Sequence, residues 1–317
     1  MNWDEPKVYA VKHLDENVIN QSRSGGIFTA ISDYILEQNG VVYGCILDQD
    51  FKAVHMRAEN SSDRNMMRGS KYIQSRLGDT YRNVKKDLLD NKFVLFTGTS
   101  CQVDGLLNYL GKEYVNLLCV DIVCHGVPSP KVWDKYLQWQ KKANRSEIRS
   151  VSFRNKKDFG WRDHKESIYL ANGKSVDSKI YTKLFYDHHI LRPCCYKCKY
   201  KSIMHPADIT IADYWGIEKA APEFDDNKGV SLVLINNEIG ERIFELIKSK
   251  INWKETRIED SMQPPLEAPF PEPEGRELFW NEFNNKKFGY IVKKYCQYGY
   301  KEKIKNILRK IKRKLIK

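Results

Sequence analysis

The sequence lacks any long hydrophobic run, and none of its apolar stretches approaches the ~20 residues that a membrane-spanning helix needs. Its opening residues, MNWDEPKVYAVKH, lack the apolar core of a signal peptide. Neither the G-x-G-x-x-G signature of dinucleotide-binding folds nor the Walker A signature of P-loops occurs. These absences predict a soluble cytoplasmic protein and argue against both of these nucleotide-binding architectures.

Disulfide bonds are not expected either. The chain has eight cysteines, but thiols stay reduced in the cytoplasm, so metal binding, redox chemistry or burial must account for them. Cys45, Cys119 and Cys296 stand in apolar or aromatic surroundings and are predicted to be small buried side chains. The other cysteines are candidates for chemistry.

The composition indicates a globular chain with an uneven charge. Of 317 residues, 41% are hydrophobic and 12% aromatic, which argues against a disordered protein and suffices for one large domain or two modest ones. The net charge is +12, but residues 300–317 hold nine Lys or Arg against Glu302 alone, so the rest carries only +4. No motif of interleaved aromatic and basic residues supports nucleic-acid binding.

The basic tail has helical periodicity. Its apolar residues recur at helical spacing, namely Ile304, Ile307, Leu308, Ile311 and Leu315. A basic amphipathic helix suits an anionic membrane surface, here the inner face of the membrane, or an acidic partner. The same pattern also fits a terminal helix that docks its apolar stripe on the body of the protein.

Strand and helix patterns alternate along the chain. Strands are predicted at 41–47, 93–98, 114–123, 207–212 and 230–236. Helices are predicted at 27–38, 79–90, 101–110, 130–142 and 237–250, and Ser129 and Pro130 mark the start of one. The stretch 263–275 holds five prolines and is expected to be extended. This order predicts an α/β (mixed α+β) fold with a C-terminal helical extension.

Four cysteines stand out by their context. Cys101 follows a predicted strand at the start of a helix, and Cys124 ends the apolar run 114–123. Cys195 and Cys198 form a C-x-x-C in RPCCYKCKY, where Arg192, Lys197 and Lys199 supply positive charge. Four thiolates around one centre suit either zinc or an iron–sulfur cluster. The C-x-x-C alone favours metal binding, with a structural zinc half-site or an exposed reducible pair as its alternatives, and Cys194 is a substitute for Cys195 in a shifted assignment.

Two polar stretches suit a cofactor. In QSRSGGIFTA, Ser24, Gly25 and Gly26 precede a helix whose N–H groups attract phosphate, or form an ordinary capped turn. RGSKYIQSRLG offers hydrogen-bond donors for phosphate or a flavin edge and one ring for stacking, or is a solvated loop; its candidates are Ser70, Lys71, Tyr72 and Ser75.

Three further residues are candidates for proton chemistry. Asp208 and Asp213 lie on the strand of ADITIADYWGI and at its end, where a carboxylate can position a proton. His125, beside Cys124, can donate a hydrogen bond to a cluster sulfur or move protons. A buried strand and a turn histidine without a role are the structural alternatives.

Six blocks of the sequence together resemble the coenzyme F420 hydrogenase/dehydrogenase beta-subunit family. They are SRSGGIFTA, RGSKYIQS, FTGTSCQVDGL, VCHGVPSP, CCYKC and ADITIADYWGI, in the family's order and within residues 20–250. The resemblance implies FAD and a [4Fe–4S] cluster, with electrons passing between them and a deazaflavin, a ferredoxin or another acceptor.

The resemblance also implies roles for residues. It implies that the cluster ligands are Cys101, Cys124, Cys195 and Cys198. It implies flavin contacts at Ser24, Gly25, Gly26, Ser70, Lys71 and Tyr72, to which we add Ser75, Thr97 and Gly98. The catalytic candidates are His125, Asp208 and Asp213. Residues 1–90 then form a flavin-contacting part, 91–262 a cluster-binding part, and 263–317 the proline-rich segment and tail.

One departure from the family concerns electron entry. Many bacterial members begin with a cysteine-rich ferredoxin-like module, but no cysteine precedes Cys45 here. We therefore expect a separate ferredoxin-like donor or a partner subunit. The predicted function is electron transfer to a small molecule or glycan precursor, in surface-polysaccharide biosynthesis. The alternative is a non-enzymatic, zinc-stapled accessory protein that its tail recruits to a membrane assembly.

Overall fold

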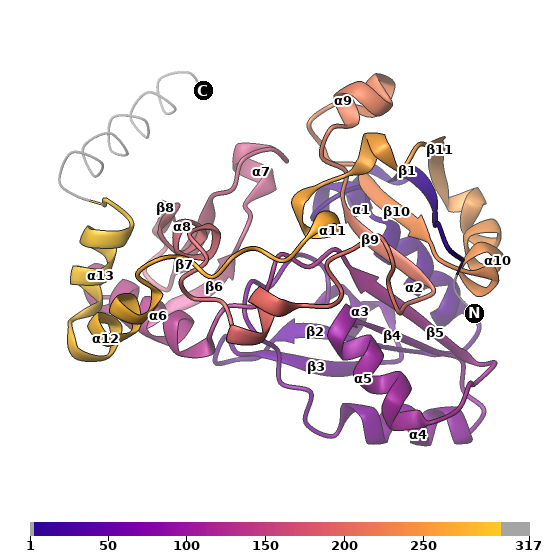
Figure 1. The fold of residues 1–317 in the computed structure, drawn as a ribbon, viewed down its shortest axis with the longest axis horizontal. Helices are drawn as coiled ribbons and strands as arrows, with labels where there is room; N and C mark the ends of the chain where they lie inside the picture. The colour runs from indigo at the N-terminus through magenta and orange to yellow at the C-terminus, as the bar shows by residue number, and fades with distance from the viewer. Residues whose placement is uncertain (1–2, 299–317) are drawn as a thin grey trace.

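The computed structural model describes residues 3–298, so the basic helix predicted within 300–317 lies outside the described residues. The larger lobe is built on an eight-stranded mixed sheet of order β11-β1-β10-β9-β5-β4-β2-β3 (Figure 1). Its strands are β1 (Lys7–His13), β2 (Val41–Leu47), β3 (Ala53–Ala58), β4 (Val94–Thr99), β5 (Leu117–Ile122), β9 (Ile209–Asp213), β10 (Ser231–Ile235) and β11 (Ile251–Thr256). Neighbours β2, β4, β5 and β9 run parallel, so their carboxyl ends share one edge.

Helices cover both faces of this sheet. The helices of the chain are α1 (Glu16–Gln21), α2 (Ile27–Glu37), α3 (Ser61–Asn65), α4 (Thr80–Leu89), α5 (Ser100–Leu110), α6 (Pro130–Asn144), α7 (Lys156–Phe159), α8 (Ile180–Tyr186), α9 (Ile217–Ala220), α10 (Glu238–Ile247), α11 (Pro264–Glu267), α12 (Arg276–Asn285) and α13 (Phe288–Tyr295). Helices α2 and α10 pack on one face, and α4 and α5 on the other. Because both faces are covered, the central strands are apolar throughout rather than alternating.

A smaller lobe, drawn at the left of Figure 1, contains the antiparallel strands β6 (Ile148–Ser152), β7 (Glu166–Leu170) and β8 (Ser175–Ser178). Helices α6, α8, α12 and α13 pack around a shared core that is rich in aromatic rings. Trp133 is 1% exposed there and packs near Phe153, with 4.6 Å between ring centroids. The core also takes in Ile73 of the larger lobe, so the two lobes are joined by packing as well as by the chain.

The predicted mixed α/β class with a C-terminal helical region is confirmed, and all ten predicted elements exist. The strand predicted at 41–47 has those bounds, whereas the run 114–123 pairs only over Leu117–Ile122. Helix α6 begins at Pro130 as predicted, although the Ser129 side chain makes no capping hydrogen bond. The proline-rich stretch contains one short helix, α11, before its extended part. The strands of the smaller lobe, the edge strands β3 and β11, and β1 beside β11 were not predicted.

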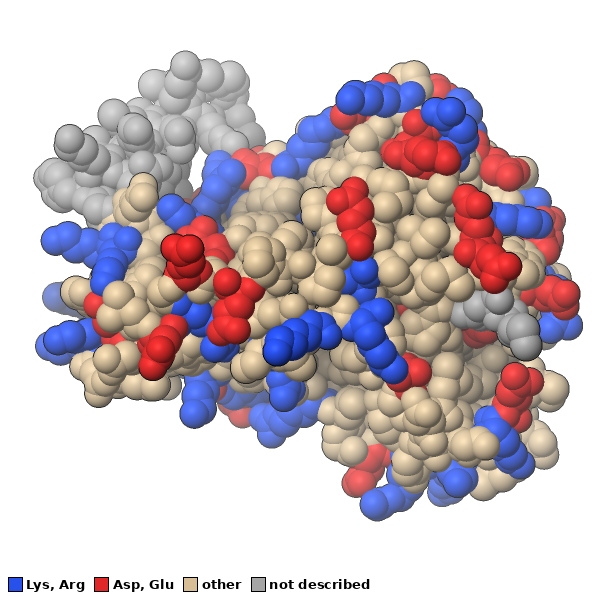
Figure 2. Space-filling view, in the orientation of Figure 1, with Lys and Arg blue, Asp and Glu red and all other residues tan. Residues whose placement is uncertain are grey.

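Basic and acidic side chains are interspersed over the face of the molecule in Figure 2, with uncharged surface between them. None of the helices within residues 3–298 combines the length and the apolar character needed to span a bilayer. The predicted division at residues 90 and 262 stays a prediction. Strands from both of those parts pair within the one large sheet, so they share a core.

Candidate functional site

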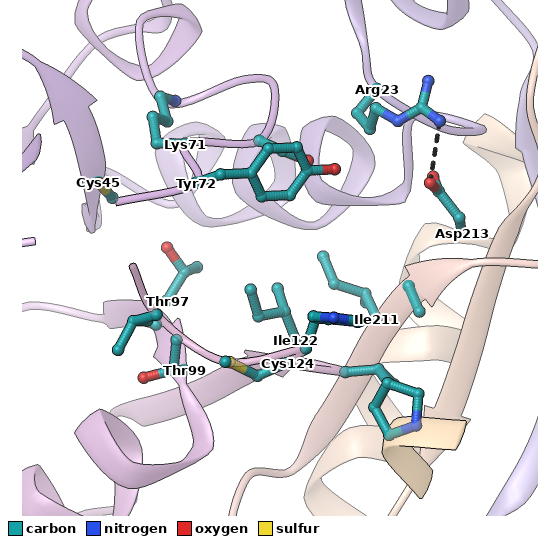
Figure 3. A pocket seen from close by; sticks show the side chains of 18 of the residues that line it. Arg23, Cys45, Lys71, Tyr72, Thr97, Thr99, Ile122, Cys124, Ile211 and Asp213 are labelled. Atoms are coloured by element: carbon teal, nitrogen blue, oxygen red, sulfur yellow. Dashed lines mark ion pairs between the residues drawn. The ribbon is translucent and has the colours of Figure 1, made fainter. Parts of the chain in front are cut away.

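A cavity lies where the parallel strands end. The loops after β4, β5 and β9 open a space of about 1650 Å³ between the two lobes. This volume exceeds the ~300–1,000 Å³ of usual small-molecule pockets, so it has room for a large cofactor and a substrate together. Figure 3 shows Lys71 and Tyr72 on one side of this space and Thr97, Ile122 and Cys124 on the other. Crevices at the carboxyl ends of strands are the usual ligand sites of α/β folds.

The four cysteines predicted as cluster ligands all line this cavity, namely Cys101, Cys124, Cys195 and Cys198. They come from three separate segments: the start of α5, the loop after β5, and the 3-10 helix Pro193–Lys197 with the residue after it. Burial, with the neighbouring thiols of Cys101 and Cys195, raises the pKa of Cys124 to about 12. The fold therefore brings these thiols together although up to 97 positions separate them in the sequence.

Cys101 lies at the first turn of α5, as expected. Thr99 caps this helix reciprocally with Gln102, and the Thr99 hydroxyl lies 3.2 Å from Cys101 Sγ. The helix N-terminus was expected to favour a thiolate; Cys101 is exposed at the cavity, yet desolvation by the surrounding protein still raises the pKa of its thiol. A thiol with a raised pKa stays protonated at neutral pH unless a metal replaces the proton.

Lys201 is the cation beside the cysteines, and no sequence pattern indicated it. Its ammonium group is buried and donates a hydrogen bond to the carbonyl oxygen of Cys124. Burial lowers the pKa of Lys201, and the thiols of Cys124, Cys198 and Cys195 oppose that shift. Lys199, predicted for this role, is mostly exposed. A buried lysine among thiolates offsets their negative charge, yet its position three residues after a C-x-x-C carries no sequence signal.

The donor set fits the cluster that the resemblance implies. Four thiols line one cavity, and Cys195 Sγ accepts a hydrogen bond from the backbone N–H of Val127 at 3.5 Å, a contact typical of ligating sulfur. Among the described residues, no three His, Cys, Asp or Glu side chains converge as ligands of a single ion. Each thiolate of a [4Fe–4S] cluster binds a different iron, so its ligands need not meet at one point.

The Ser24–Gly26 turn packs against the sheet edge beside the cavity. Ser24 and Gly26 line the cavity, whereas Gly25 lies beneath it, where its N–H donates to Ser231 Oγ at 3.0 Å. Gly26 takes a φ of 94° as the N-cap of α2, a conformation that glycine adopts without strain. A Cβ on Gly25 would lie 2.1 Å from the carbonyl oxygen of Val11. The two glycines are therefore required for different reasons.

Alanine at Gly25 is expected to destabilise the protein by ~1–3 kcal/mol or more, because the added methyl meets backbone atoms of β1 that cannot move aside. The measurement is the free energy of unfolding in urea. Gly289→Ala is the matched control, since its nearest atom lies at an ordinary 3.5 Å. Equal stability of the two variants would contradict the close packing of this turn.

The second predicted cofactor stretch lines the cavity next to this turn, on the side of Arg23 in Figure 3. Lys71 lines the cavity, but its ammonium donates to the carbonyls of Met67 at 2.7 Å and Arg68 at 3.0 Å, and burial lowers its pKa to about 8. The Tyr72 ring stacks on Phe185 with 4.8 Å between centroids. Ser70 also lines the cavity, as does Ser75, whose hydroxyl accepts a hydrogen bond from Gln102. With a third bond to the carbonyl of Met66 at 3.1 Å, the Lys71 ammonium uses all three of its N–H donors to shape this loop.

Thr97 and Gly98 form the end of β4 and also line the cavity. The Thr97 hydroxyl donates to the carbonyl of Tyr43 at 2.9 Å, and its own carbonyl lies 3.1 Å from His55 Nε2. His55 stacks on Phe96, and its Nδ1 is buried without a hydrogen-bond partner among the described residues. A second proton on this ring would have no acceptor.

We expect stability to fall as the pH drops from about 6.5 towards 4. Burial lowers the pKa of His55 to about 4, so the unfolded chain takes up a proton in this window before the folded protein does. Between pH 7 and 4.5, His55 alone should lower the free energy of unfolding by about 2–3 kcal/mol. Urea midpoints across this range test it. His55→Phe, which keeps the stack on Phe96, should flatten the profile; an unchanged slope would contradict the assignment.

The predicted catalytic residues separate in the structure. Asp213 ends β9 at the cavity, whereas Asp208 precedes β9 at the opposite end of the strand and does not line the cavity. Asp208 accepts hydrogen bonds from the backbone N–H of Cys119 and the side chain of Asn237, a structural role. His125 lines the cavity, and its Nε2 lies 2.8 Å from that of His188.

Asp213 is held by groups that were not among the predicted site residues. Its carboxylate pairs with Arg23 at 3.1 Å, lies 3.6 Å from Arg154, and accepts from Trp161 Nε1 at 3.2 Å. Trp161 stacks on Trp215 with 4.9 Å between centroids. Arg23 directly precedes Ser24, so the first polar stretch already pointed to it. Arg154 comes from the smaller lobe, and only the packing of the lobes brings it here.

Comparison with known proteins agrees with this architecture. The family model for the C terminus of the coenzyme F420 hydrogenase/dehydrogenase beta subunit matches residues 91–261, more than half of the chain. A chain from the solved F420-reducing [NiFe] hydrogenase complex of Methanosarcina barkeri superposes with a TM-score of 0.54 at 18% identity, covering 79% of this chain and 82% of that one. At this identity the likeness shows a shared fold. No curated protein sequence matches significantly.

Proposed function

This chain belongs to the coenzyme F420 hydrogenase/dehydrogenase beta-subunit family, and from that membership we propose that it is an iron–sulfur flavoprotein oxidoreductase. The proposed cluster ligands are Cys101, Cys124, Cys195 and Cys198. The proposed flavin contacts are Ser24, Gly26, Ser70, Lys71, Tyr72, Ser75, Thr97 and Gly98, with Gly25 supporting them from below. When bound, these groups would supply one-electron transfer at the cluster and hydride transfer at the flavin.

One observation carries the proposal: the four thiols line the same cavity as both predicted flavin-binding stretches. Electron transfer between two cofactors needs them close together, and a single cavity holds both sets of residues. Lys201 would offset the negative charge of the thiolates from within the protein. The described residues of the chain thus prepare the binding, orientation and electrostatics that such cofactors require of a protein.

The acidic and basic groups at the cavity suit redox chemistry on an organic molecule. Burial lowers the pKa of His125 to about 3, so that its ring is neutral and can relay a proton through His188, 2.8 Å away. Asp213 would orient groups of the substrate rather than exchange protons freely, since two guanidinium groups hold it. We propose a ferredoxin-like donor or partner subunit as the electron source and a small molecule or glycan precursor as the substrate.

An anaerobic absorption spectrum, with iron, sulfide, flavin and zinc measured on the same sample, tests the proposal. We expect a broad iron–sulfur band and flavin peaks that bleach on reduction, with about four irons per chain for one [4Fe–4S] cluster. Cys198→Ser should lose the iron and the reduction of the flavin together. Zinc without colour would refute the redox function and leave a metal-stapled accessory protein. Retention of both properties in Cys198→Ser would remove Cys198 from the ligand set.

A further inference from the structure

Two largely buried arginines from different lobes meet at the wall of the cavity. Arg23 lies in the loop before α2, and Arg154 follows β6 in the smaller lobe. Their side chains are only 10% and 3% exposed, yet both line the cavity. Each donates a hydrogen bond to the carbonyl oxygen of Trp161, at 2.8 and 3.1 Å, and each faces Asp213. Figure 3 shows Arg23 reaching across to Asp213 beside Tyr72.

These contacts leave hydrogen-bonding capacity unused. Nε and Nη1 of Arg23 and Nε of Arg154 are buried and have no hydrogen-bond partner among the described residues. An unsatisfied buried donor costs ~1–3 kcal/mol, and more when it is charged, so this arrangement favours a ligand that accepts these bonds. Arg154 uses another nitrogen to donate to the Tyr72 hydroxyl at 3.2 Å.

The charge at this place is positive. Asp213 balances only one of the two guanidinium groups. Lys156 lies behind them, where its ammonium donates to backbone carbonyls that include Lys228 at 2.7 Å, and burial lowers its pKa to about 8. An excess of positive charge with free N–H donors is the chemistry of an anion site.

We propose that Arg23 and Arg154 bind a singly charged carboxylate of the organic substrate. This inference rests on the proposed function, because it assigns the acid to the molecule on which the enzyme acts. The two guanidinium groups already hold one carboxylate, that of Asp213, and the nitrogens that it leaves without a partner can donate to a second carboxylate. Arginine is suited to this ligand because its planar guanidinium can bind both carboxylate oxygens.

The position along the sheet supports a substrate group. Ile122 of β5 pairs with Ile211 of β9, so Cys124 and Asp213 follow on neighbouring strands at the same level. Asp213, which the arginines hold, therefore ends its strand next to the one that leads to Cys124, and the arginines line the same cavity as the proposed cluster ligands and flavin contacts. Trp215 lines the cavity next to them, 5.5 Å from the Arg154 guanidinium, and adds apolar surface for contact with the body of the substrate.

Calorimetric titration of the full-length, anaerobically purified protein tests the site. The probes are acetate, pyruvate and D-glucuronate, with D-glucose as a neutral counterpart and inorganic pyrophosphate as the flavin-like anion. We expect at least one carboxylate to bind, and Arg23→Met and Arg154→Met to weaken it by ~10- to 100-fold, the size of a lost charge-assisted bond. Flavin content should stay at the wild-type level in both variants.

Two further variants keep the test decisive. Arg23→Lys retains the charge without the planar fork and should bind with intermediate affinity, even if Arg154→Met folds poorly. Arg162→Met is the matched control, because Arg162 is 44% exposed and pairs with Asp225 outside the cavity; it should bind as the wild type does.

Three outcomes would overturn the proposal: no carboxylate binds the wild type, the arginine variants bind as well as it does, or they lose flavin and pyrophosphate binding instead. The last outcome would assign the arginines to the phosphates of the flavin. Iron and flavin assays on the same samples separate these results from failure of the proposed function. A protein without either cofactor refutes the redox function, while carboxylate binding is measured independently of it.

Discussion

Serine in place of Cys195 is expected to reduce the iron content to background, whereas serine in place of Cys194 leaves it unchanged. Cys195 is half-buried beside the loop that follows Cys124, and its sulfur accepts the Val127 N–H. Cys194 lies on the same turn of 3-10 helix and also lines the cavity, but the Val127 N–H contact belongs to Cys195. A serine hydroxyl rarely replaces a thiolate as an iron ligand, because it is far harder to deprotonate. Iron and sulfide per chain, with the absorption band of the cluster, measure the effect.

The pair of variants is its own control, because both change one sulfur to oxygen in adjacent residues. Loss of iron in Cys194→Ser with retention in Cys195→Ser would place Cys194 in the ligand set. Loss in both would mean that the turn, rather than one thiol, determines cluster binding. In either case the geometry around Val127 would not have identified the ligand.

Alanine at Glu166 is expected to lower the free energy of unfolding by ~3–5 kcal/mol, because it removes the centre of a buried hydrogen-bond network. Glu166 is 2% exposed, and its carboxylate accepts five hydrogen bonds. The donors are the hydroxyls of Tyr136, Ser178 and Thr182 and the backbone N–H groups of Tyr181 and Thr182. The last two belong to the first turn of α8, which Glu166 therefore caps from a neighbouring strand.

The consequence reaches the cavity, because α8 carries Phe185, the ring on which Tyr72 stacks. Urea unfolding followed by tryptophan fluorescence measures the loss. Glu166→Gln should lower the free energy of unfolding by an intermediate amount. Its amide oxygen can still accept hydrogen bonds, but its amide nitrogen cannot replace the second carboxylate oxygen as an acceptor. Glu147→Ala, at a mostly exposed ion pair with Lys141, should change stability by less than ~1 kcal/mol. Equal effects at Glu147 and Glu166 would contradict the network.

The strands of the large sheet were predictable because burial on both faces leaves an apolar signature in the sequence. The run at 41–47 became β2 with the same bounds. The strands of the smaller lobe were not predictable, because they are short and mix polar with apolar residues. Strand β8, for example, has only four residues. The core of this lobe forms by contacts between α6 and helices near the C-terminus, which no local pattern encodes.

The sequence by itself determined which residue types this protein offers for chemistry: a C-x-x-C, two cysteines at strand ends, and two polar stretches before and between helices. Those signals are local, because turns, caps and apolar runs restrict the backbone over a few residues. Only the tertiary structure decided which of them meet. It placed Asp213 at the cavity and Asp208 at the far end of the same strand, since a strand separates its ends by several ångströms per pair of residues. It also brought Lys201 to the thiols and Arg154 to Arg23, because electrostatic partners are selected by packing between distant segments.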